Sequence, residues 1–106
     1  MASARLETRR IVDWGTFHDA CAATFGFPDF YGRNLDAWID CLTYLDVGMS
    51  RFDLPPGEVL TIEVMCFDGF RSRVPEIAEA LVECAAFVNR RLAEKGDPLR
   101  LALVPL

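Results

Sequence analysis

The stretch FYGRNLDAWIDCLT, residues 30–43, carries the clearest helix signal in the chain. Asn34 is a residue type that caps helix N-termini well, and Gly32 interrupts regular structure just before it. After Asn34, apolar residues recur at i, i+3, i+7 and i+10, as Leu35, Trp38, Leu42 and Leu45. This spacing makes one apolar stripe and predicts a helix from Leu35 to about Asp46 that packs on a core.

Two carboxylates fall on the face of this helix that is opposite the stripe. At about 100° per residue, Cys41 joins the core side, and the other side gathers Asp36, Asp40 and Thr43, with Ile39 and Tyr44 flanking them. Like charges at i and i+4 cost an isolated helix roughly 0.2–0.5 kcal/mol, so helix stability does not require this pair. Two interpretations stay open. The pair forms a solvated polar face, or it mimics nucleic-acid phosphates and binds a cleft lined by arginine and lysine.

The remaining sequence alternates strand and helix signals. Asp13 is placed as the N-cap of a helix that starts at Trp14, with Phe17, Ala20, Cys21 and Thr24 at helical spacing. The other predicted elements are a strand at Arg9–Val12, a loop at Gly48–Gly57 with two prolines, a central strand at Val59–Val64, a long third helix from Pro75 to about Lys95 that Gly96 stops, and a last strand at Leu99–Val104. We expect one α/β domain over residues 1–106, with a three-stranded, mostly parallel sheet packed against helices.

Composition narrows the possible functions. A chain of 106 residues with 52% hydrophobic residues can fold around its own core without disulfides or metal. Its net charge of −5 repels duplex nucleic acid, so we expect no direct nucleic-acid binding. The sequence contains no apolar run long enough to span a bilayer and no signal-peptide core after the polar N-terminus. We therefore expect a cytoplasmic protein that does not bind membranes and is monomeric when free.

The cysteines and the single histidine do not form a recognisable catalytic or metal-binding motif. The four cysteines lie apart, each in an apolar stretch, so we expect buried free thiols, no metal and no cofactor; they are Cys21, Cys41, Cys66 and Cys84. His18 and Cys21 lie on one predicted helix at i and i+3, and we expect His18 to be an ordinary exposed histidine. Asp36 and Asp40 could form an acid/base couple, but nothing else resembles a sugar cleft. We predict no catalytic residues and no enzyme activity.

Arginines on and before the long helix are weak evidence for RNA binding, because no aromatic stacking platform accompanies them. Arg71, Arg73, Arg90 and Arg91 are expected to solvate that helix and to pair with its glutamates, which are Glu76, Glu79, Glu83 and Glu94. Tyr31 and Trp14 are expected to be packing residues.

The segments Tyr31–Ala37 and Asp40–Thr43 resemble the signature of the barstar family, whose members are intracellular inhibitors of a secreted ribonuclease. The resemblance implies a small α/β fold in which this helix and the loop before it plug the active site of a basic ribonuclease. It implies that Asp40 reaches deepest into that site and that Cys41 and Leu42 belong to the core. The partner contacts that it implies are Phe30, Gly32, Asn34, Asp36, Ile39, Asp40 and Thr43.

The sequence departs from the family pattern around this centre. Phe30 lacks the hydroxyl of the tyrosine in the family's type protein, and Ile39 replaces its interface tryptophan. An acidic contact late in the last long helix falls near Arg90 or Arg91, and the loop from Val47 to Gly57 differs in length. We expect an immunity or antitoxin-type inhibitor of an extracellular-type or toxin ribonuclease. The alternative is an immunity or regulatory protein of the same fold for a different, non-ribonuclease partner.

Overall fold

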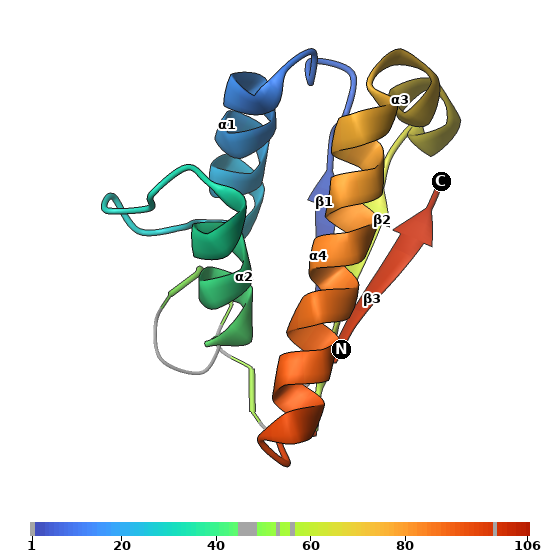
Figure 1. Ribbon diagram of the computed structural model, residues 1–106. Coiled ribbons are helices and arrows are strands. Elements are labelled where there is room, and N and C mark those ends of the chain that lie inside the picture. Colours follow the sequence, from blue (N-terminus) through green and yellow to red (C-terminus); the bar gives the residue numbers. More distant parts are fainter. Residues whose placement is uncertain (1, 45–48, 53, 56, 99) are drawn as a thin grey trace.

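The computed structural model describes residues 2–44, 49–52, 54–55, 57–98 and 100–106. Within this part, three strands and four helices follow one another as β1 (Ala2–Leu6), α1 (Trp14–Phe25), α2 (Leu35–Thr43), β2 (Val59–Val64), α3 (Phe67–Arg73), α4 (Pro75–Glu94) and β3 (Arg100–Pro105). The long helix α4 runs lengthwise along the sheet and packs against both β3 and α2 (Figure 1). The predicted α/β fold is confirmed.

The sheet has the strand order β1-β2-β3, and both neighbouring pairs are parallel. Ala2 to Leu6 pair with Leu60 to Val64, and β2 pairs with β3 along its other edge. Burial alternates along β1 and β2, so every second side chain faces the core. The prediction that residues 59–64 form the central strand is confirmed.

The first strand was predicted in the wrong place. Arg9–Val12 is not a strand, because the chain turns there and the Ile11 amide donates to the Thr8 carbonyl at 3.1 Å. The Arg73 guanidinium donates to the carbonyls of Thr8 and Ile11, at 2.9 Å each. Ile11 is fully buried, so its β-branched side chain fills the core from a turn. The last strand starts at Arg100, and its predicted first residue, Leu99, lies outside the described residues.

The helix boundaries follow local signals in the chain. Asp13 caps α1 in a capping box with Thr16, and Gly26 ends it at a φ of 65°. Pro75 lies in the first turn of α4, which ends at Glu94 just before Gly96 at a φ of 75°. These predictions are confirmed, except that a short helix, α3, was missed and the long helix is therefore the fourth.

The core lies between the sheet and the helices. Its largest fully buried side chains are Trp38, Phe17, Phe25, Phe70, Leu6, Ile11, Leu42, Leu60, Ile62, Leu81 and Leu92. All four cysteines are free thiols, but Cys66 is only half-buried and therefore departs from the predicted burial. Within the described residues, no helix is long and apolar enough to cross a membrane, and no cluster of three or more His, Cys, Asp or Glu side chains could hold a metal.

Candidate functional site

Helix α2 begins where the sequence predicts. The Asn34 side chain accepts a hydrogen bond from the Ala37 amide at 2.7 Å and donates one to the Gly32 carbonyl at 3.3 Å. The helix ends at Thr43, where the Tyr44 amide donates to the Asp40 carbonyl at 3.1 Å. It is therefore shorter than predicted, and Leu45 and Asp46 lie outside the described residues. The cap fixes the first turn, in which Asp36 lies.

The apolar face of α2 points into the core as predicted. Trp38 and Leu42 are completely buried, Cys41 is nearly so, and Leu35 packs partly buried against the same core. The Trp38 ring meets Phe25 edge-on, with ring centroids 6.2 Å apart. These contacts hold α2 at one rotation angle, so the residues on its other face have fixed directions.

The outer face of α2 presents Asp36 and Asp40 to solvent, whereas Thr43, at the end of the same face, is buried. The expectation that Thr43 is exposed together with the two aspartates is wrong, because Thr43 is only 1% exposed. Its Oγ1 donates to the Ile39 carbonyl at 2.7 Å, so the hydroxyl is satisfied within its own helix and needs no water. Ile39 borders the outer face and is 9% exposed.

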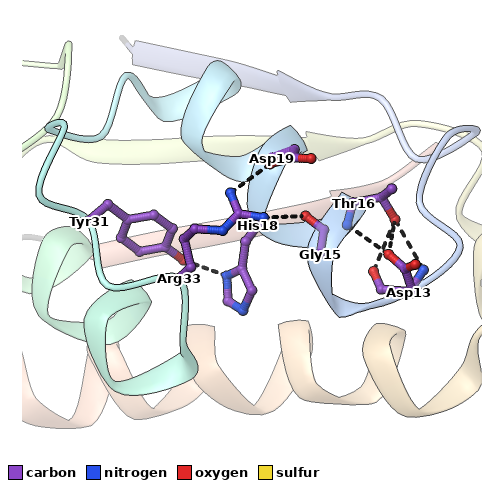
Figure 2. Close-up of polar contacts among 7 residues, drawn as sticks. All are labelled: Asp13, Gly15, Thr16, His18, Asp19, Tyr31 and Arg33. Atoms are coloured by element: carbon purple, nitrogen blue, oxygen red, sulfur yellow. Dashed lines mark hydrogen bonds and ion pairs between the residues drawn. The ribbon is translucent and has the colours of Figure 1, made fainter.

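The loop before α2 combines one exposed aromatic side chain with one buried one. Phe30 is 75% exposed, whereas Tyr31 is buried. The Tyr31 hydroxyl lies 2.7 Å from Nδ1 of His18 on α1 (Figure 2). The prediction of an exposed histidine is wrong, because His18 is buried and its ring contacts the rings of Trp14, Phe17 and Tyr31. The prediction that Tyr31 packs in the interior is confirmed.

Arg33 ties the same loop to α1. Its guanidinium donates to Oδ1 of Asp19 at 2.6 Å and to the Gly15 carbonyl at 3.1 Å (Figure 2). Its φ is 54°, a left-handed conformation that is uncommon for a residue with a side chain. Arg33 directly precedes Asn34, the N-cap of α2. Its hydrogen bonds to α1 therefore hold the first turn of α2 in place.

Burial governs the ionisation of the groups behind this loop. Burial lowers the pKa of His18, nearby Arg33 lowers it further, and Asp19 partly opposes both effects. Burial also raises the pKa of the Tyr31 hydroxyl above its ordinary value, so both partners are neutral at pH 7. Burial raises the pKa of Cys21 to about 12, which keeps it a thiol. These groups therefore form a packed hydrogen bond and an unreactive thiol.

Helix α4 supplies the second border of the acidic face. Nη1 of Arg91 lies 2.9 Å from Oδ1 of Asp40, and Nζ of Lys95 lies 4.6 Å from the centroid of the Tyr44 ring. Phe87, on the same helix, is 46% exposed. A shallow hollow of about 520 Å³ is lined by Asp36, Ile39, Asp40, Phe87 and Arg91.

The arginines make contacts that differ from those predicted. Arg91 pairs with a carboxylate on another helix rather than with a glutamate of its own, and Arg73 binds backbone carbonyls. The hydrogen bond to Asp40 raises the pKa of Arg91 above its already high ordinary value, so Arg91 stays charged. In the sequence, the only hint of this contact was the cationic pair Arg90-Arg91 at a position where the family resemblance implies an acid.

Fold and site together define a small α/β domain with a parallel three-stranded sheet, which exposes two aspartates of α2 and, in the loop before it, Phe30. A family model described as Barstar (barnase inhibitor) matches residues 1–104, so the chain belongs to this family. The signature at residues 31–43 therefore identified the family correctly. No curated protein matches the chain.

Proposed function

We propose that this protein is an immunity or antitoxin-type inhibitor that blocks the active site of a basic ribonuclease with α2 and the loop before it. The observation that carries the proposal is the exposed pair Asp36 and Asp40, one turn apart on a helix whose other face is buried in the core. The family description, a barnase inhibitor, supports the same role.

The chemistry of the target explains why this arrangement would inhibit it. A ribonuclease cleft binds phosphates through arginine and lysine side chains, and carboxylates are strong partners for those cations. The two aspartates would occupy the places of substrate phosphates, and exposed Phe30 would contact the rim of the cleft. The further contacts that we propose are Gly32, Asn34 and Ile39. Thr43 is buried, so it is left out of the proposed contacts.

The bonds behind the loop favour tight binding. Tyr31 and Arg33 hold the loop on α1 before any partner arrives. A surface that is already ordered loses less entropy on association, so more of the interaction energy appears as affinity. The net charge of −5 would also steer a basic partner toward the protein, which makes the association rate sensitive to salt.

The test uses barnase, the ribonuclease in the family's description, and measures binding kinetics between low and physiological salt. Asp40→Ala and Asp36→Asn should each weaken binding by about 2 kcal/mol or more, because cations in the cleft lose their partners. Glu79→Ala is the matched control, since it removes an exposed acid on α4 that lies outside the hollow. The proposal would be contradicted if the Asp36 and Asp40 variants bind barnase as tightly as the native protein, or if the association rate does not change with salt.

A second candidate is an immunity or regulatory protein for a partner that is not a ribonuclease. It is favoured by the cation beside Asp40, which makes the face less acidic than the two aspartates alone would. The two candidates separate in a pull-down from the secreted proteins and toxins of the source organism. A captured protein that depends on Asp36 and Asp40 but cleaves no RNA would support this second role.

A further inference from the structure

The two aspartates of α2 have different surroundings in the free protein. Asp40 is ion-paired with Arg91, a residue 51 positions away in the chain. Among the residues that the structure describes, no cation lies within ion-pair distance of Asp36. One of the two carboxylates, that of Asp40, is therefore already paired with a cation of the same molecule.

Arg91 is placed where it would affect an incoming partner. It lines the same hollow as Asp36 and Asp40, and its side chain is 33% exposed. A partner cation that approaches Asp40 meets the guanidinium already bound there. When water is excluded, Arg91 and the partner cation repel each other across the Asp40 carboxylate, unless an anion of the partner pairs with Arg91. The guanidinium has five N–H donors, of which one binds Oδ1 of Asp40 and another is used by the side chain of Tyr44, so donors remain for a second carboxylate.

We propose that Arg91 determines which ribonuclease this face accepts. It competes for Asp40 and disfavours clefts that present only cations toward α4. It admits a ribonuclease that carries a carboxylate beside its central cation, so that partner cation, Asp40, Arg91 and partner carboxylate alternate in charge. This inference rests on the proposed function and adds the chemistry of the cognate partner.

The first arm of the test examines the free protein and needs no ribonuclease. Nitrogen-15 NMR of the Arg91 guanidinium should show slowed rotation and separate Nη signals, because the ion pair restrains the group. Asp40→Asn should remove that signature, and the signals of Arg90, the neighbouring exposed arginine, should not change. A freely rotating Arg91 guanidinium in the native protein would overturn the inference, whatever the protein binds.

The second arm measures the affinity of variants for barnase as a probe with a basic cleft. Arg91→Ala and Arg91→Glu should bind it about tenfold more tightly than the native protein, because Asp40 is freed and a like charge is removed. Arg90→Ala should bind like the native protein. With Asp40→Asn already in place, adding Arg91→Ala should give no further gain over Asp40→Asn alone, and a gain that persists there would mean that Arg91 does not act through Asp40.

The possible outcomes separate this inference from the proposed function. If Asp36→Asn abolishes barnase binding but Arg91→Ala does not tighten it, the inference fails and the inhibitor role stands. If neither the native protein nor any Arg91 variant binds barnase, the proposed function fails for this ribonuclease and the selective role fails with it. Tightening that depends on Asp40 supports both.

Discussion

The two flanks of α2 are built in different ways. On the loop flank, Tyr31 is buried against His18, and the Arg33 guanidinium binds α1 at two points. On the α4 flank, α2 packs against α4, and a partly exposed ion pair joins Asp40 to Arg91. A buried neutral hydrogen bond is costly to break, because a desolvated group is left without its partner, whereas a partly exposed ion pair contributes little to stability. The two flanks therefore differ in the buried Tyr31–His18 hydrogen bond, because the ion pairs Arg33–Asp19 and Arg91–Asp40 are both partly exposed.

The largest effect on stability should come from breaking the loop flank with Tyr31→Phe. The change leaves Nδ1 of His18 buried without its partner, which should lower the free energy of unfolding by about 1–3 kcal/mol. Tyr44→Phe on the α4 flank is the matched control, because Tyr44 is only half-buried. Urea denaturation of both variants measures the difference, and equal losses would contradict the contrast between the flanks.

The next effect concerns the cap at the start of α2. Asn34→Ala removes the acceptor of the Ala37 amide and should lower the free energy of unfolding by about 1 kcal/mol. Asn34→Asp retains a side-chain acceptor near the positive end of the helix dipole and should restore most of that loss. Thermal and urea unfolding check this prediction. If Asn34→Asp does not restore the loss, Asn34 acts instead through the hydrogen bond that its side-chain amide donates to the Gly32 carbonyl.

Acid should loosen the loop flank through His18. Its pKa is lowered in the folded protein, mainly by burial, so the unfolded chain binds the proton more readily. The stability contributed by neutral His18 is therefore fully present above its ordinary pKa of about 6.5 and is lost as the pH falls below it. Urea unfolding from pH 7.5 to pH 5 should show this loss, and His18→Gln should reduce it. A profile unchanged by His18→Gln would assign the effect to other groups.

The smallest effect on stability should follow from Asp40→Ala. Loss of the exposed pair with Arg91 costs little, and it is offset by removing the i, i+4 repulsion with Asp36. The free energy of unfolding should change by less than about 0.5 kcal/mol, although the same change should weaken barnase binding strongly. Urea unfolding and calorimetric binding on one variant test both statements. A large loss of stability would make Asp40 a structural residue.

Local signals predicted much of the fold. The caps at Asp13 and Asn34, the proline that opens α4 and the glycine that follows it depend on neighbours within one turn, so the sequence alone reveals them. Strand β1 was missed because Ala, Ser and Arg have little strand preference of their own. Only pairing with β2, far along the chain, makes Ala2–Leu6 a strand.

The candidate site was predicted correctly where helix periodicity decides, and incorrectly where distant contacts decide. Helical spacing separates buried Trp38 and Leu42 from exposed Asp36 and Asp40, as the structure does. Spacing could not show that Thr43, on the same face as the aspartates, is buried with its hydroxyl bonded to the Ile39 carbonyl. The pairs His18–Tyr31 and Asp40–Arg91 join separate elements, so no spacing rule could show them.

The parallel sheet also has a consequence for the rate of folding. Of the three described strands, none pairs with a strand joined to it by a tight turn, and the hydrogen bond from the Thr8 hydroxyl to the Met65 carbonyl spans 57 positions. Chain entropy must be lost across such separations before the sheet contributes any stability. We therefore expect the capped helices to form early and the sheet late, with the pairing of β2 with β1 and β3 as the slow step of folding.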